Sequence, residues 1–407
     1  MRIAILTPGI LPVPAVKGGA VENLVQEILD ENRTDDSLNI TVFGLADQSA
    51  RSAAAEKYPY IDFALFRSGK LAQALDRIIY ILVRFIRKNA NLISYRYILE
   101  RLSVIMQYGC ILRRKNFDRV ILVNNSTLFL IFLFPSVRKK FLKKSTFYLH
   151  NEVSKMFGAK RLLPYISSVW GISKFVLDSF DHRFPGIIGV PHYVIKNSLD
   201  DHLFSTSHAS EVRSLRKKWN CPPEDFVVLF SGRLVYEKGA RQLLEATRTL
   251  EIPNLKIIVI GGTFYSSDVT SSYMIQLRAL AREQNNRVIF TGYIPYEQMP
   301  AAYELADVVC LPSMWDEPAG MTMLEAASMG KPLITTRSGG IPEYLSEDRV
   351  FMVDRANVVD EVNRDISFIY QHLSSEQDKA QEYAKSLREK YSRRNYYRRF
   401  RRLLEVN

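Results

Sequence analysis

Two acidic residues with seven residues between them, Glu317 and Glu325, lie in the stretch "DEPAGMTMLEAASMGKP" at residues 316–332. At helical spacing, the neighbours of Glu325 are small or apolar: Met321, Thr322, Ser328 and Met329. A carboxylate buried in such surroundings is costly unless a protein group or a ligand pairs with it. The two acids therefore predict sites that accept hydrogen bonds from ligand hydroxyls. The alternative is a surface acid favoured by a helix dipole together with one structural glutamate.

The residues around the two acids carry the signals of a helix. Pro318 suits the first helical turn, and Gly330 and Pro332 suit a helix end. We therefore expect Glu317 just before the helix and Glu325 about two turns inside it. The amides from Ala319 to Thr322, with Gly320 and Met321 among them, would then be free to hold an anion such as a phosphate.

A second group of polar residues lies in "SGRLVYEKGARQLLEA", after a predicted strand. It contains Gly232, Arg233 and Lys238, and Gly239 opens the next predicted helix. Two cations at a strand end suit a diphosphate, because Arg offers a planar fork and Lys a point charge. The alternative is a pair of solvated surface charges.

Two further candidates lie in the first half of the chain. The loop "TPGILPVPAVKGGAVENL" ends in Gly18 and Gly19 at a predicted helix start, where the backbone can approach an anion or a sugar. His150 ends the predicted strand "KSTFYLH", so it is a candidate for contact with substrate. A lone histidine is more often structural, and the loop matches neither a dinucleotide-binding nor a phosphate-binding fingerprint.

The elements that must position these residues alternate between strand and helix in both halves, which predicts an α/β protein with two doubly wound parallel sheets. We expect an N-terminal domain at 1–198, a second domain at 199–379 and a basic helix at 380–407. The predicted strands are 2–7, 39–45, 117–123, 144–150, 167–173, 226–234, 255–262, 287–294, 307–313 and 331–336.

Several classes of protein are disfavoured. There is no D-x-D pair to hold a metal on a nucleotide, no zinc spacing and no Walker motif, so we expect neither a metal nor another cofactor. Three widely spaced cysteines favour a cytoplasmic protein with free thiols. The uncharged run 120–137 is long enough to span a membrane, but a strand, a capped polar turn and a short apolar helix also explain it.

Charge is distributed unevenly along the chain. Residues 1–200 hold 28 Lys and Arg against 16 Asp and Glu, whereas residues 201–379 carry a net charge of −6 and residues 380–407 carry +6. A basic domain suits an anionic membrane surface. The stretches 77–102 and 138–144, which mix apolar and basic residues, predict peripheral attachment. Ordinary solvated basic helices are the alternative.

Taken in order, the Gly-Gly loop, "FSGRLVYEKG", the pair Glu317 and Glu325, and "GKPLITTRSGGIPE" resemble the retaining glycosyltransferases of family 4. The resemblance covers nearly the whole chain. It implies the GT-B fold, in which two Rossmann-like domains face each other across a cleft and the last helix crosses back to the N-terminal domain. Two residues depart from the family pattern: Ser198 and Ser231 stand where the family usually has glycine.

The resemblance also implies roles for the candidate residues. Arg233 and Lys238 would bind the donor diphosphate, and Glu325 would accept hydrogen bonds from the ribose. Glu317 and His150 would contact the donor sugar. The remaining donor-binding positions implied in this way are Gly18, Gly19, Gly232, Tyr293, Gly320, Met321 and Thr322.

The implied reaction is the transfer, with retention and without a metal, of a hexosyl-type sugar from a nucleotide-sugar, with UDP as the expected nucleotide. The expected acceptor is a lipid-linked glycan or oligosaccharide in surface polysaccharide biosynthesis, at the inner face of the cell membrane. A GT-B phosphorylase or an epimerase is an alternative on the same fold. A nucleic-acid or polyanion-binding module is the non-enzymatic alternative, because the tail "RRNYYRRFRR" mixes basic and aromatic residues. We do not expect nucleic acid, since it leaves Glu317 and Glu325 unexplained.

Overall fold

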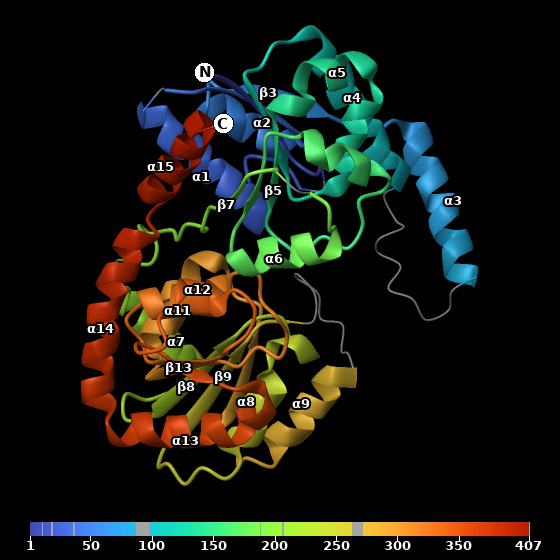
Figure 1. Ribbon diagram of the computed structural model, residues 1–407. Helices are drawn as coiled ribbons and strands as arrows, with labels where there is room; N and C mark the ends of the chain where they lie inside the picture. The colour runs from blue at the N-terminus through green and yellow to red at the C-terminus, as the bar shows by residue number, and fades with distance from the viewer. Residues whose placement is uncertain are drawn as a thin grey trace. The chain divides into compact units, whose positions relative to one another are not determined.

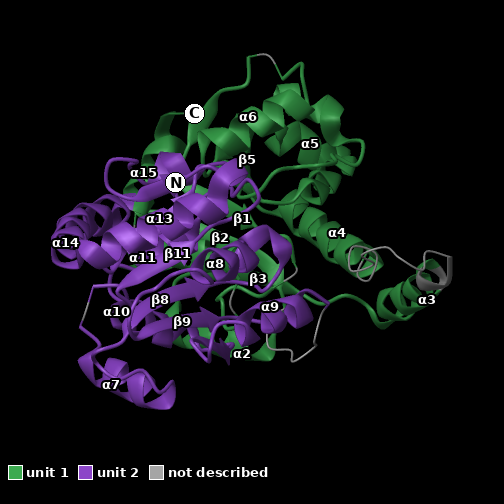
Figure 2. Ribbon diagram, turned by 90° about the horizontal axis from the view of Figure 1, so that it is seen from below, with its two compact units in different colours: residues 1–195, 396–407 green, residues 196–395 purple. Residues whose placement is uncertain are grey.

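The computed structural model describes residues 1–9, 11–17, 19–35, 37–86, 98–187, 189–205, 207–262 and 272–406. The chain forms two compact units, coloured separately in Figure 2. Unit 1 comprises Met1–Ile195 together with Tyr396–Asn407, and unit 2 comprises Lys196–Asn395.

Unit 1 is built on a seven-stranded parallel sheet in the order β3-β2-β1-β4-β5-β6-β7. Its central strands are almost continuous apolar runs, as expected for a parallel sheet covered by helices on both faces. The strands are β1 (Arg2–Leu6), β2 (Asn39–Leu45), β3 (Asp62–Phe66), β4 (Arg119–Val123), β5 (Ser145–Leu149), β6 (Ser168–Gly171) and β7 (His192–Val194).

The helices of unit 1 connect these strands, and α3 stands out at the side of the unit beside α4 (Figure 1). Asn125 caps the 3₁₀ helix of residues 126–133, because its side chain accepts the amide of Thr127. The helices are α1 (Ala20–Asp35), α2 (Gln48–Lys57), α3 (Lys70–Ile86), α4 (Ile98–Arg114), α5 (Pro135–Phe141), α6 (Lys174–Arg183) and most of α15 (Arg393–Val406).

Unit 2 repeats the architecture with a six-stranded parallel sheet in the order β10-β9-β8-β11-β12-β13. The strands are β8 (Phe226–Ser231), β9 (Leu255–Ile260), β10 (Val288–Gly292), β11 (Val308–Leu311), β12 (Leu333–Thr336) and β13 (Phe351–Val353). The helices are α7 (Ala209–Lys218), α8 (Ala240–Thr247), α9 (Ser272–Arg282), α10 (Met299–Leu305), α11 (Met321–Ser328), α12 (Ile341–Tyr344), α13 (Val358–Gln371) and α14 (Leu373–Lys390). The carboxyl ends of β8 and β11, which are neighbours, carry the candidate residues of this unit.

The C-terminal segment is not the single helix expected at 380–407. It is divided between α14 and α15, and the side chain of Ser392 accepts the amide of Asn395 at the break, 3.3 Å away. Residues up to 395 belong to unit 2, and residues from Tyr396 onward belong to unit 1.

The aromatic residues of this tail are part of the core of unit 1. The hydroxyl of Tyr396 lies 3.2 Å from that of Tyr148, and the ring of Phe400 packs edge-on against Trp170. Because Tyr396, Tyr397 and Phe400 are buried, they offer no exposed rings for stacking on bases. This burial removes the aromatic part of the observation on which the nucleic-acid alternative rested, and the basic charge of the tail remains.

Among the described residues, no helix is both long enough and apolar enough to cross a bilayer. The uncharged run at 120–137 is divided between β4, the 3₁₀ helix and the start of α5.

Candidate functional site

The carboxylate of Glu317 is buried in unit 2 and paired with a cation. Its Oε1 atom accepts hydrogen bonds from Nζ of Lys238, 2.5 Å away, and from Oγ of Ser313, 2.9 Å away. Glu317 follows β11 and Lys238 follows β8, so parallel pairing of these two strands brings the residues together. The sequence predicted both residues as site members but did not predict their ion pair.

Close backbone contacts fix the two loops that carry this pair. Gly239 has a φ of 79°, and a Cβ there would overlap the carbonyl of Pro312. Gly339 has a φ of 56°, and a Cβ there would overlap the backbone of Glu317. The amide of Gly340 donates to the Glu317 carbonyl, 2.7 Å away. Both glycines adopt a left-handed backbone conformation and pack directly against another backbone segment, which a residue with a side chain could not do. These two contacts fix the position of the loop that carries the Glu317 carboxylate.

The helix after Glu317 begins later than expected. Gly320 adopts a φ of 72°, and α11 starts at Met321 rather than at Pro318. A residue in the left-handed region cannot be part of a right-handed helix. Glu317 is therefore separated from the helix by a three-residue loop, and Glu325 lies about one turn inside it rather than two.

The N-terminus of α11 retains free donors. In the described part of the chain, the amides from Ala319 to Thr322 donate to no protein group, and no side chain caps the helix. Met321 and Thr322 are partly exposed. The amides at this helix end, together with Lys238 in the loop after β8, are the donors that an anionic ligand requires.

Glu325 is buried, and its partners are two tyrosines. The hydroxyl of Tyr296 donates to Oε1, 2.9 Å away, and that of Tyr303 approaches Oε2 at 3.5 Å. Burial raises the pKa of Glu325 to about 7, against the lowering effect of the two hydroxyls. Burial therefore disfavours the ionised carboxylate, and the two tyrosine hydroxyls partly offset that cost.

One of the two serines that depart from the family pattern, Ser231, belongs to this network. Oγ of Ser231, at the end of β8, lies 2.9 Å from the hydroxyl of Tyr303, and both residues are buried. Sequence reasoning singled out Tyr293, whose ring is exposed, and overlooked Tyr296 and Tyr303. The available signal was the seven-residue spacing of those tyrosines, which places two residues on one face of a helix.

Arg233 differs from Lys238 in its surroundings. Its side chain is exposed, and no acidic residue pairs with it in the described part of unit 2. The adjacent Gly232 has a φ of 153°, and its amide donates to the carbonyl of Ile260 on β9. Arg233 is thus a free cation on an anchored turn.

The remaining predicted residues belong to unit 1. Gly18 lies outside the described residues. Gly19 precedes α1, and a Cβ there would overlap the carboxylate of Glu22. Burial raises the pKa of Glu22. The sequence analysis did not single out Glu22, whose carboxylate lies beside Gly19 at the end of the Gly-Gly loop.

His150 is buried at the end of β5. Within the described residues, neither ring nitrogen has a hydrogen-bond partner. Burial lowers its pKa to about 3, so the imidazole is neutral at ordinary pH. Oδ1 of Asn124 accepts a hydrogen bond from the backbone amide of His150, 3.0 Å away, and the ring of Tyr148 packs against the imidazole. Two unpaired nitrogens in a buried ring are costly to the fold, which points to a ligand as their partner.

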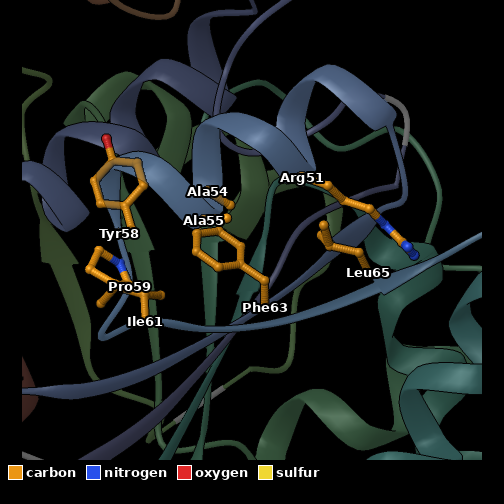
Figure 3. Close-up of a pocket in the computed structure, with 8 residues that line it drawn as sticks. All are labelled: Arg51, Ala54, Ala55, Tyr58, Pro59, Ile61, Phe63 and Leu65. Carbon is orange, nitrogen blue, oxygen red and sulfur yellow. The ribbon is translucent and has the colours of Figure 1, made fainter.

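A separate hollow of about 450 Å³ lies in unit 1 at the edge strand β3 and helix α2, with Arg51 and Tyr58 at its two ends (Figure 3). None of the predicted site residues lines it.

Comparisons with known proteins indicate the fold and the class of enzyme. Residues 211–387 match the family "Glycosyl transferases group 1". A putative glycosyltransferase of Bacillus subtilis, YtcC, is 27% identical over 381 residues, which cover 90% of this chain and 81% of that protein. The lipopolysaccharide 1,2-N-acetylglucosaminetransferase of Salmonella typhimurium is 27% identical over 195 residues, which cover 46% of this chain and 50% of that protein.

The crystal structure of HepE from Anabaena in complex with UDP superposes with a TM-score of 0.72 at 18% identity over the full length of both chains. This likeness confirms the predicted α/β class and the GT-B fold. The family match and the relatives support a glycosyltransferase of the GT-B type.

Proposed function

We propose that this chain is a retaining glycosyltransferase of family 4 that transfers a hexosyl-type sugar from a UDP-sugar without a metal ion. The proposal is carried by one arrangement in unit 2: a buried Glu325, the Lys238–Glu317 pair and the free amides at the start of α11. UDP is favoured because HepE, which shares the fold, was crystallised with UDP.

In this proposal, Glu325 accepts hydrogen bonds from the ribose hydroxyls of the donor. Arg233, Lys238 and the amides near Met321 hold the diphosphate, with Gly232 and Gly320 allowing the backbone to approach it closely. These groups supply positive charge that a metal ion would otherwise provide, and no D-x-D pair is present in the sequence to hold one.

Glu317 and His150 contact the donor sugar. Because His150 is neutral, it donates or accepts a hydrogen bond without adding charge. The backbone beside Tyr293 contacts the base, Thr322 lies beside the phosphates or the sugar, and Gly18 and Gly19 lie near the phosphates.

The reaction breaks the bond between the anomeric carbon and the diphosphate and forms a bond from that carbon to the acceptor oxygen. The acceptor proton passes to an oxygen of the departing diphosphate, so no carboxylate of the chain acts as the base. Lys238 and Arg233 stabilise the negative charge on the leaving group.

The proposed acceptor is a lipid-linked glycan in surface polysaccharide biosynthesis, on the cytoplasmic face of an anionic membrane. Unit 1 holds 31 Lys and Arg against 16 Asp and Glu, whereas unit 2 holds 24 against 27. A positive acceptor domain suits an anionic lipid surface. The Salmonella relative named for lipopolysaccharide is consistent with such an acceptor.

The test is to measure the release of nucleoside diphosphate from UDP-, GDP- and ADP-sugars with EDTA present and with a lipid-linked oligosaccharide as acceptor. We expect release from a UDP-sugar and a product with the anomeric configuration of the donor. Release that requires a metal, or an inverted product, would contradict the proposal.

A further inference from the structure

Helix α3 of unit 1 presents a row of large aliphatic side chains to solvent. The exposed fractions are 73% for Leu71, 41% for Leu75, 53% for Ile78 and 65% for Ile81. The spacing of these four residues, here called the α3 stripe, places them on one face of the helix. Four exposed large aliphatic side chains on one face of a surface helix indicate an interaction site.

Charges on α3 are sorted between its two faces. Lys70 and Arg77 are exposed, and in the described part of the chain neither pairs with an acid. Asp76, the single acid of α3, is buried and turned toward α4, where its two carboxylate oxygens accept the amides of Leu99 and Glu100 at 3.0 and 2.9 Å. The exposed face of α3, as far as the structure describes its side chains, therefore carries aliphatic residues, and its only charges are positive.

Further cations of unit 1 are exposed at the end of α4 and on α5, two helices of the same unit as α3 (Figure 2). Arg113, Arg114, Arg138 and Lys139 are exposed there. A partner for the exposed face of α3, which carries Lys70 and Arg77, must therefore be apolar inside and negative at its surface. A second copy of the chain would present the same cations, whereas an anionic bilayer meets both requirements.

We infer that the α3 stripe inserts into the headgroup region of an anionic bilayer, with Lys70 and Arg77 at the level of the lipid phosphates. This rests on the proposed function, since a lipid-linked acceptor requires the enzyme to work at a membrane. It goes further by assigning the attachment to one face of one helix.

The test uses the full-length protein and vesicles of phosphatidylcholine alone or mixed equally with phosphatidylglycerol, with binding measured by co-sedimentation. Ile81→Ser has a matched control in Ile275→Ser, because Ile275 on α9 of unit 2 is exposed to 61%. We expect Ile81→Ser to weaken binding to the anionic vesicles about threefold or more and Ile275→Ser to leave it unchanged. The triple variant Leu71→Ser/Ile78→Ser/Ile81→Ser should weaken it by about thirtyfold or more.

The double variant Lys70→Gln/Arg77→Gln should reduce the preference for anionic over neutral vesicles about tenfold. Three results would overturn the inference: wild type that binds neither vesicle or both equally, a triple variant that binds like wild type, or a triple variant that changes only the oligomeric state in gel filtration. Thermal unfolding checks that each variant is folded.

Donor turnover separates this inference from the proposed function. Release of nucleoside diphosphate in vesicle-free solution should be the same for wild type and the triple variant. Wild type that binds vesicles through α3 but releases nothing from any donor would refute the proposed function and leave the α3 assignment standing.

Discussion

Nζ of Lys238 lies 2.5 Å from Oε1 of Glu317, and this pair joins the loop after β8 to the loop after β11. The carboxylate is almost fully buried and the ammonium mostly so, with exposed side-chain fractions of 8% and 23%. One cation of the proposed donor site therefore contributes to the fold, whereas Arg233, which is exposed, does not.

Lys238→Ala should lower both stability and activity. The substitution leaves the buried carboxylate of Glu317 with Ser313 as its remaining side-chain donor, so the free energy of unfolding should fall by about 2–4 kcal/mol. Combining it with Glu317→Gln should restore most of that loss, which urea unfolding can measure. Equal stability of the single and double variants would show that the pair does not act as described.

Arg233→Ala should affect catalysis alone. Because the side chain is exposed and unpaired, the free energy of unfolding should change by less than about 0.5 kcal/mol. The loss of a diphosphate contact should lower kcat/KM for the donor about 10–100-fold. Unchanged kinetics would remove Arg233 from the site.

Ser231→Ala should weaken donor binding through Tyr303 and Glu325. The substitution removes the 2.9 Å contact to the buried Tyr303 hydroxyl, which costs about 1 kcal/mol of stability. A less firmly held Tyr303 should raise the donor KM a few-fold with little change in kcat. A double-mutant cycle with Tyr303→Phe checks the coupling, and strictly additive effects would exclude it.

Glu325→Gln should remove a pH dependence of stability. The carboxyl has a pKa of about 7 in the fold, raised from 4.5, so the folded state holds the proton more tightly than the unfolded state. That contribution is complete below the unfolded pKa and is lost as pH rises through about 7. The variant should therefore gain stability relative to wild type between about pH 5 and pH 8, as measured by thermal unfolding. A constant difference over that range would mean that Glu325 is ionised throughout.

His150→Phe should separate stability from activity in unit 1. The imidazole contributes two buried nitrogens without partners, so an apolar ring should leave the melting temperature equal or higher. Donor turnover should fall about 100-fold if those nitrogens bind the sugar. A clear loss of stability would instead identify His150 as a structural residue.

The sequence predicted the strands that have strong apolar runs, because burial of β1, β4, β8 and β11 requires continuous hydrophobic residues. It missed β3, β7 and β13. The strand β3 lies at an edge and is only partly buried, and β7 and β13 have three residues each, too few for a periodic signal.

Within the candidate site, the charged residues of unit 2 were predictable, but their hydrogen-bond and ion-pair partners were not. The late start of α11 depends on the left-handed backbone of Gly320, which the sequence allows but does not require. The tyrosine partners of Glu325 come from residues 22 and 29 positions away, so only the folded chain shows the contacts.

The most direct test of the central claim, that Glu325 binds the ribose of the donor, is calorimetry of UDP and 2′,3′-dideoxy-UDP with wild type and Glu325→Gln. Wild type should bind UDP at least about tenfold more tightly than the dideoxy analogue, since the analogue leaves a buried carboxylate without ligand donors. Glu325→Gln should lose most of that discrimination by weakening UDP alone. Equal discrimination in the two proteins would show that the ribose is bound elsewhere and would contradict the account.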